Sequence, residues 1–177
     1  MAVRTIMIFP KFEHMEVIQE IRKKYDPLHG LVEPHITLVF PFEEETLSNE
    51  ILERRLSECL EKFSAFPLTL QGISKVHDTY GHYLFLNVIQ GIDELVKLHD
   101  QLYEVLWHKK DAINYYPHLT VGKLRTQEEL EKAYLEVKNL EETFHSIVNK
   151  ISVEMIGPHE ESIIIIEKEL SSASYAE

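Results

Sequence analysis

The sequence contains a single cysteine, Cys59, so no disulfide can form within the chain. This excludes the disulfide-rich scaffolds typical of small secreted proteins. A lone cysteine in a segment with helical spacing is far more often a small core residue than a catalytic thiol. The chain also lacks a basic N-terminal segment followed by a long apolar run, and its apolar runs are too short to cross a bilayer. We therefore expect a cytoplasmic protein without a membrane partner.

Basic residues are scarce. Lysine and arginine number 18 against 30 aspartates and glutamates, which gives a formal net charge of −12. Broad binding along a nucleic-acid backbone depends on positive surface, so extended nucleic-acid binding is not expected. A local site for one phosphate remains compatible with this balance. The acidity favours small nucleotides or an RNA terminus over long RNA as partners.

Length and composition are those of an ordinary globular protein. The chain has 177 residues, of which 44% are apolar and 27% charged, and this suffices for one substantial domain. No linker separates independent units. We expect one bilobed domain over residues 1–170, with lobe halves near 1–76 and 82–156 and an exchange of strands between them left open. Residues 171–177 are expected to form a flexible tail.

Both halves show the same order of periodic segments, namely strand, helix, strand, helix and strand. Ser48 and Thr126 are expected helix N-caps. The expected helices are Phe12–Tyr25, Ser48 to about Lys62, Gly91–Trp107 and Thr126 to about Leu140. The expected strands are Thr5–Phe9, His35–Phe40 (closed by Pro41), Phe66–Val76, His82–Ile89, His118–Lys123, Phe144–Ile156 and Ser162–Lys168. The fold class is α+β, with antiparallel sheets lining a central cleft and helices outside.

One short motif occurs twice, once in each half. The first copy is Pro34-His35-Ile36-Thr37-Leu38 and the second is Pro117-His118-Leu119-Thr120-Val121. Successive side chains of a strand point to opposite faces, so in each copy His and Thr share one face and the two apolar residues share the other. If the halves pair about a pseudo-two-fold axis, two imidazoles and two hydroxyls converge on one spot, which we interpret as the active site.

A pair of imidazoles suits cleavage of a phosphodiester. An unperturbed imidazole titrates near pH 6.5, so one ring can accept a proton while the other donates one. Cleavage requires both acts, because a nucleophile is deprotonated while the departing alkoxide is protonated. Two threonine hydroxyls can donate to the non-bridging phosphate oxygens. The residues alone do not decide which histidine is acid and which is base.

A third Pro-His pair, Pro158-His159, serves as an internal control. It is followed by Glu160 and Glu161 and lacks both the threonine and the apolar alternation. Pro-His by itself therefore carries little information. A lone His-x-Thr would more often be a polar pair at a strand end; two symmetric copies favour a functional site.

The two motifs resemble the signature of the two-histidine (2H) phosphoesterases, which is a pair of His-x-Thr/Ser-x motifs. This family includes RNA 2′,3′-cyclic phosphodiesterases, the bacterial enzymes called 2′-5′ RNA ligases, and plant cyclic phosphodiesterases. The segments Tyr25–Phe42 and Pro117–Gly122 are similar to a small bacterial branch named as phosphoesterases. The resemblance spans the chain and implies a bilobed α+β fold with a cleft between pseudo-symmetric lobes. It also implies that His35 is the proton donor and His118 the acceptor.

Other side chains near the motifs have two interpretations each. Tyr115 and Tyr116 could stack a nucleobase, but an aromatic pair before a strand is equally often core packing, and Phe42 has the same ambiguity. Lys123 follows the second motif and could supply charge to a phosphate. Simple alternation, however, places Gly122 and not Lys123 on the side of His118.

The leading hypothesis is thus a metal-independent hydrolase that acts on a cyclic phosphodiester or a 2′,5′-linked nucleotide or RNA end. We expect no cofactor and no functional metal, since the ten histidines show no tight metal-binding spacing. We expect a monomer. The alternatives are a non-catalytic nucleotide- or phosphate-binding module that uses the same cleft, and a metal-dependent hydrolase. The substrate is expected to be held by loops at 25–33, 77–82 and 109–116.

Overall fold

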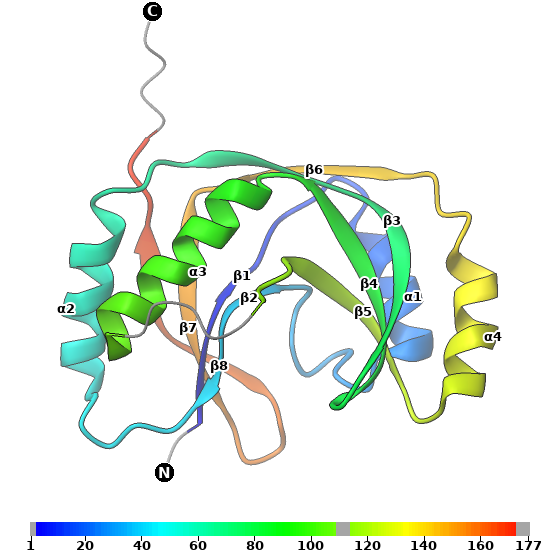
Figure 1. The fold of residues 1–177 in the computed structure, drawn as a ribbon, viewed down its shortest axis with the longest axis horizontal. Helices are drawn as coiled ribbons and strands as arrows, with labels where there is room; N and C mark the ends of the chain where they lie inside the picture. The colour runs from blue at the N-terminus through cyan, green and yellow to red at the C-terminus, as the bar shows by residue number, and fades with distance from the viewer. Residues whose placement is uncertain (1–2, 109–113, 173–177) are drawn as a thin grey trace, which may run out of the picture.

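The structure, a computed structural model, describes residues 3–108 and 114–172. Helices and strands follow one another along these residues in the order that the sequence predicts, except that the segment 144–156 forms two strands (Figure 1). The helices are α1 (Met15–Tyr25), α2 (Asn49–Leu60), α3 (Ile92–Trp107) and α4 (Gln127–Val137). The strands are β1 (Arg4–Ile8), β2 (Ile36–Phe42), β3 (Phe66–Asp78), β4 (Gly81–Gln90), β5 (His118–Leu124), β6 (Thr143–Val148), β7 (Lys150–Ile156) and β8 (Ser162–Glu169).

The strands form two four-stranded sheets whose neighbouring strands are all antiparallel. One has the order β2-β1-β7-β8 and the other β5-β4-β3-β6. Helices α2 and α3 pack on the first sheet, through β8 and β2, while α1 and α4 pack on the second (Figure 1). The α+β class, the antiparallel sheets and the outer helices are therefore as expected.

The lobes do not follow the two halves of the sequence, because several elements are exchanged. Strand β3, from the first half, pairs with β4 in the second sheet, whereas β7 and β8 close the first sheet. Helix α1 packs on β5 and helix α3 on β2. The exchange of β3 has a local cause: a tight turn joins it to β4, with Asp78 Oδ1 accepting from Tyr80 N at 2.8 Å and Gly81 N at 3.1 Å. Neighbouring strands joined by so short a turn pair with each other.

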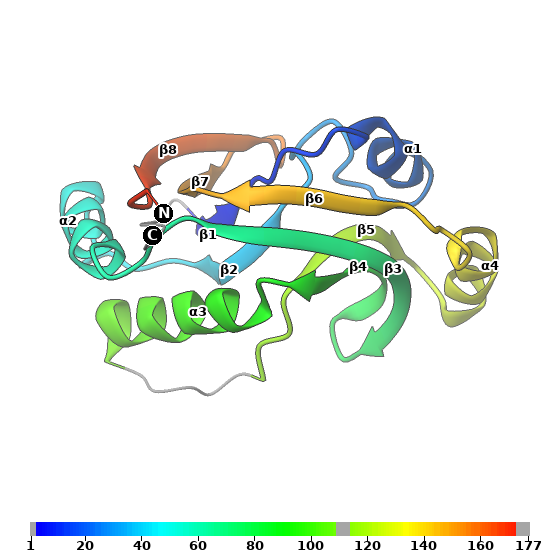
Figure 2. The ribbon, with the colours of Figure 1, turned by 90° about the horizontal axis from the view of Figure 1, so that it is seen from above.

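The segment expected as one strand over 144–156 is two strands in different sheets. Strand β6 pairs with β3 and strand β7 pairs with β1 and β8. Figure 2 shows the chain running from one sheet to the other at this point. Asn149 lies between the strands, and its carbonyl accepts from Leu170 N at 2.8 Å. Periodicity did not reveal the break, since buried residues continue on both sides of it.

The ends of the elements differ slightly from expectation. Strand β2 continues through Pro41, which an edge strand tolerates because no ladder hydrogen bond is needed on its outer side. Both predicted N-caps are confirmed: Ser48 Oγ accepts from Ile51 N at 3.3 Å and Thr126 Oγ1 accepts from Glu129 N at 3.2 Å. Helix α1 begins at Met15 and α4 ends at Val137, so both are shorter than expected.

The expected tail is tied down at its start. Ser171 O accepts from Ala65 N at 2.8 Å, and Ser171 Oγ donates to Phe63 O at 3.0 Å. Residues 173–177, the rest of that segment, lie outside the described residues.

The buried apolar side chains form one cluster that draws on both sheets. Ile6 and Ile36 contribute from the first sheet, and Leu84 and Leu119 from the second, all four with no exposed surface. Cys59 belongs to this cluster as a core residue. Within 3–108 and 114–172, no helix combines the length and apolarity that a bilayer span requires.

Candidate active site

Both copies of the motif show the predicted alternation. In β2, Ile36 and Leu38 are fully buried, while His35 just before the strand and Thr37 within it are half-buried. In β5 the burial is the same: Leu119 and Val121 have no exposed surface, and His118 and Thr120 are half-buried. Each motif thus anchors its apolar residues in the core and leaves its polar pair accessible to a ligand.

The two motif strands meet although they belong to different sheets. Each is the end strand of its sheet, and β2 contacts β5 (Figure 1). The rings are close enough to influence each other, since positive charge on His35 lowers the pKa of His118. The structure thus places the two strands that carry the motifs side by side.

Each imidazole is held through the same atom by the same kind of partner. Nδ1 of His35 lies 2.8 Å from the carbonyl oxygen of Glu33, and Nδ1 of His118 lies 2.7 Å from that of Tyr116. A carbonyl can only accept, so Nδ1 carries the proton in both rings. Nε2 is then an acceptor in the neutral ring and a donor in the imidazolium, and either ring can serve as base or acid.

Burial lowers the pKa of both histidines, because a charged ring loses solvation when it is buried. The hydrogen bonds to the Glu33 and Tyr116 carbonyls oppose this effect. A smaller influence on the pKa of His35 comes from Arg22, which lowers it. In the absence of an anion, both rings therefore favour the neutral form near pH 7.

A buried ion pair holds the loop that carries the Glu33 carbonyl. Arg22 is 1% exposed, and its Nε donates to Asp26 Oδ2 at 2.7 Å. Its Nη2 donates to Val32 O at 2.7 Å, and Asp26 Oδ1 accepts from Leu28 N at 3.0 Å. These bonds fix the loop between α1 and β2, and with it the orientation of the His35 ring. Sequence reasoning missed Arg22; its spacing of four from Asp26 at the end of a helix was the available signal.

The polar face of the second sheet continues beyond the motif. Asn87 lies opposite His118 across the β4–β5 ladder, and its Oδ1 accepts from Ser74 Oγ at 2.9 Å. Phe85 lies opposite Thr120, and its ring stacks on that of His118 at 3.6 Å and 18°. Within the described ranges, neither Thr37 nor Thr120 uses its hydroxyl for a hydrogen bond to another residue.

The expectation for Lys123 is wrong because β5 contains a bulge. Thr120 pairs with Phe85, but Gly122 pairs with Leu84, so Val121 is an extra residue and the alternation shifts. Lys123 consequently lies opposite Tyr83, with Nζ 5.7 Å from that ring centroid. Tyr83 stacks on Phe85 at 5.6 Å, so Lys123 is on the same face as Thr120. A bulge cannot be read from residue spacing.

The three aromatic candidates for substrate binding differ in their surroundings. Tyr115 packs against the core, stacks on His99 at 4.0 Å and donates its hydroxyl to Thr37 O at 2.8 Å, so its interpretation as a packing residue is the one that fits. Phe42 likewise packs edge-on against Trp107 at 5.1 Å. Tyr116 is 56% exposed, with its ring 6.4 Å from that of His118. Of the three, Tyr116 is the most exposed.

The remaining candidates are placed as follows. In the described part of the chain no cluster of three or more His, Cys, Asp or Glu side chains could hold a metal ion. His77 and His82 stack in parallel at 4.4 Å, which does not direct their nitrogens to one point. Burial raises the pKa of the Cys59 thiol to about 11, which opposes a nucleophilic role. Of the expected 109–116 loop, residues 109–113 lie outside the described residues.

A pocket of about 570 Å³ opens beside the loop that leads to His35. Glu33 and Phe9 line it, and the Phe9 ring lies 6.0 Å from the ring of His35, but neither His35 nor His118 is part of its lining. Ser152 and Glu167, from β7 and β8, line it as well. Its volume is in the range of small-molecule sites.

Comparisons with known proteins point to one family. A family model described as the 2′-5′ RNA ligase superfamily matches residues 10–155. A protein of Geobacillus thermodenitrificans named "Putative phosphoesterase" is 29% identical over 133 residues, covering 75% of this chain and 76% of that protein. A Bacillus cereus protein of the same name is 30% identical over 118 residues, covering 67% of each.

Solved structures show the same fold. LigT of E. coli in its apo form superposes with a TM-score of 0.62 at 16% identity, covering 97% of this chain and 98% of that chain. The same protein in complex with 3′-AMP gives a TM-score of 0.61 at 17% identity, covering 97% and 99%. At this identity the likeness concerns the fold.

Proposed function

Because the chain belongs to the 2′-5′ RNA ligase superfamily, we propose that it is a metal-independent phosphoesterase that hydrolyses a cyclic phosphodiester or a 2′,5′-linked nucleotide or RNA end. One observation carries this proposal. Two imidazoles on facing strands each have Nδ1 held by a carbonyl and Nε2 available for proton transfer. Relatives named as phosphoesterases support the reaction class.

In the proposed reaction the neutral His118 accepts a proton on Nε2 from a water molecule as that water attacks phosphorus. A bond forms between the water oxygen and phosphorus while the bond from phosphorus to the leaving oxygen breaks. His35, as the imidazolium, donates its Nε2 proton to the departing alkoxide. His118 ends the turnover protonated and His35 neutral, and exchange with solvent restores both. The assignment of donor and acceptor follows the family resemblance.

The substrate itself supplies the charge that this cycle needs. Burial holds the pKa of both free histidines low, but a phosphate between the rings favours the imidazolium, because an opposite charge raises a histidine pKa. The free hydroxyls of Thr37 and Thr120 are placed to donate to the non-bridging oxygens. Two fixed donors and a charged ring stabilise the transition state without a metal.

The surroundings of the two rings suit a small nucleotide or an RNA terminus. Tyr116 offers an exposed ring beside His118, and base–aromatic stacking is a common mode for unpaired bases. Lys123 supplies a positive charge on the same face. The net charge of −12 opposes binding along an extended nucleic acid.

The test is hydrolysis of 2′,3′-cyclic nucleotides and 2′,5′-linked dinucleotides in excess chelator. His35→Ala and His118→Ala should each lower kcat by about 10²–10⁴-fold. His159→Ala is the matched control, since His159 also follows a proline but lacks the motif. Full activity in both motif variants would sink the assignment. Loss of activity on chelation, restored by zinc or manganese, would favour a metal-dependent hydrolase instead.

A binding module that uses the same cleft is the alternative. It would bind mononucleotides, as measured by calorimetry, and turn over none of these substrates. The presence of two titratable rings beside two free hydroxyls favours catalysis, because binding alone does not require paired proton-transfer groups.

A further inference from the structure

The first motif lies on a strand whose outer edge no other strand covers. Strand β2 ends its sheet, so the backbone groups on its outer side have no partner in the ladder. The edge is also irregular: Met7 pairs with Thr37 and Ile6 with Val39, which leaves Leu38 as an extra residue. An edge strand with a bulge is poorly constrained by its own sheet.

Side chains from the second half of the chain donate hydrogen bonds to backbone carbonyls of this edge strand. Tyr115 donates its hydroxyl to Thr37 O at 2.8 Å, and His99 Nδ1 donates to the carbonyl of the bulged Leu38 at 2.7 Å. His99 is only 2% exposed. Both bonds are accepted by carbonyl groups of the motif itself, those of Thr37 and Leu38.

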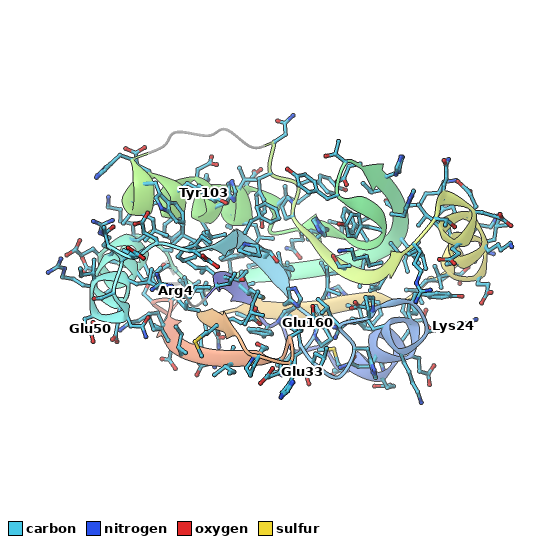
Figure 3. The ribbon with its side chains drawn as sticks, turned by 90° about the horizontal axis from the view of Figure 1, so that it is seen from below. Arg4, Lys24, Glu33, Glu50, Tyr103 and Glu160 are labelled. Atoms are coloured by element: carbon cyan, nitrogen blue, oxygen red, sulfur yellow. The ribbon has the colours of Figure 1, made fainter. Side chains whose placement is uncertain are left out.

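The two donors support each other. The rings of His99 and Tyr115 stack at 4.0 Å with an angle of 1° between their planes. Tyr103, which like His99 belongs to α3 (Figure 3), has its ring 4.6 Å from that of His99. Its hydroxyl accepts a longer bond of 3.4 Å from Phe40 N. Burial raises the pKa of the Tyr115 hydroxyl, so it stays a donor throughout the working pH range.

Tyr115 also belongs to the segment that fixes the other histidine. The next residue, Tyr116, provides the carbonyl that holds Nδ1 of His118. Pro117 follows and restricts the backbone before β5. One short segment therefore contacts the peptide of Thr37 on one side and the ring of His118 on the other.

We propose that Tyr115 and His99 are positioning residues: they hold the bulged edge of β2 and so set where His35 and Thr37 lie relative to His118 and Thr120. The inference rests on the proposed function, because its consequence is the geometry of proton transfer. Neither residue reacts with the substrate. A misplacement of the order of 1 Å between reacting groups can cost about 10²-fold in rate.

The test uses Tyr115→Phe, which keeps the ring and its stacking and removes only the donor. We expect kcat on a 2′,3′-cyclic nucleotide to fall about tenfold or more, with KM within about twofold. Tyr103→Phe is the matched control, because its bond is long and lies farther along the strand; its kcat should stay within about twofold of wild type. His99→Gln, which retains a donor, should keep more activity than His99→Leu.

Hydrogen exchange of the amides of Ile36–Phe42 measures the hold on β2 without any substrate. Tyr115→Phe should raise exchange there, and Tyr103→Phe should not. If exchange rises in Tyr115→Phe but kcat does not fall, the bond is only structural and the inference is overturned. The inference is also overturned if neither exchange nor kcat changes in this variant. If the wild type turns over no substrate while exchange rises in Tyr115→Phe, the proposed function fails and the hold on β2 stands.

Discussion

The ring of His118 stacks flat on Phe85 at 3.6 Å, whereas the ring of His35 meets Phe9 at 6.0 Å and an angle of 56°. The bond that holds each ring is nevertheless the same, from Nδ1 to the carbonyl two residues earlier. The repeated motif therefore fixes which atom of each ring is available. The neighbours that are not repeated give the two rings different environments, and a difference in environment is what lets like groups take unlike roles.

The largest expected effect separates the acid from the base. His118→Ala should lower kcat by about 10²–10⁴-fold whatever the leaving group, because the attacking water always requires a base. His35→Ala should show a similar loss with an alkoxide leaving group but a far smaller loss with a p-nitrophenyl nucleotide ester, which leaves without protonation. Steady-state kinetics on both substrates make the comparison. A rescue of His118→Ala instead of His35→Ala would reverse the assignment.

The rate of hydrolysis should also depend strongly on pH, through both His35 and His118. The pKa of each histidine is lowered in the folded protein by burial. The rate kcat/KM should be bell-shaped, since it needs one neutral and one charged ring, with its maximum on the acid side of the usual histidine pKa of about 6.5. A profile that is flat between pH 5 and pH 8 would contradict a two-imidazole mechanism.

The same lowered pKa values make stability fall on acidification. Between the folded and unfolded pKa values the unfolded chain binds more protons, so the free energy of unfolding decreases as the pH falls below about 6.5 and through the folded values. His35→Gln and His118→Gln should each remove part of this slope. Urea unfolding between pH 5 and pH 8 measures it, and comparing the single variants shows which copy is the more strongly perturbed. Slopes identical to wild type in both variants would refute the proposed origin.

The features that the two motifs share could be predicted from the sequence, whereas the neighbours that differ between them could not. Strand alternation correctly gave the buried and accessible residues of both motifs, because it depends only on local geometry. It failed at Lys123, where the bulge at Val121 shifts the faces. Bulges depend on contacts between distant segments, and so does the placement of β7 and β8 in the first sheet, which the sequence left open. The holding roles of Arg22 and Tyr115 depend on such contacts too.

A smaller effect should distinguish the aromatic neighbours of the two rings. Phe85→Leu removes the flat support under His118 and should destabilise the protein by about 1 kcal/mol and lower kcat several-fold. Phe9→Leu is the matched change at His35, and its effect on kcat should be smaller because that contact is longer and tilted. Thermal unfolding and steady-state kinetics on both variants test this. Equal losses of kcat would mean that the stacking difference has no functional weight.

The smallest expected effect concerns Lys123, which lies outside the repeated motif. Its Nζ is exposed and near the Tyr83 ring, so its attraction to a substrate phosphate is screened by solvent and salt. Lys123→Gln should raise KM by about two- to fivefold at low salt, with kcat nearly unchanged. Raising the salt concentration should narrow the gap to wild type. Arg125→Gln, two residues further along and also exposed, is the control and should leave KM unchanged. An equal rise in KM for both variants would indicate general attraction by surface charge, and the face assigned to Lys123 by the bulge would then have no bearing on binding.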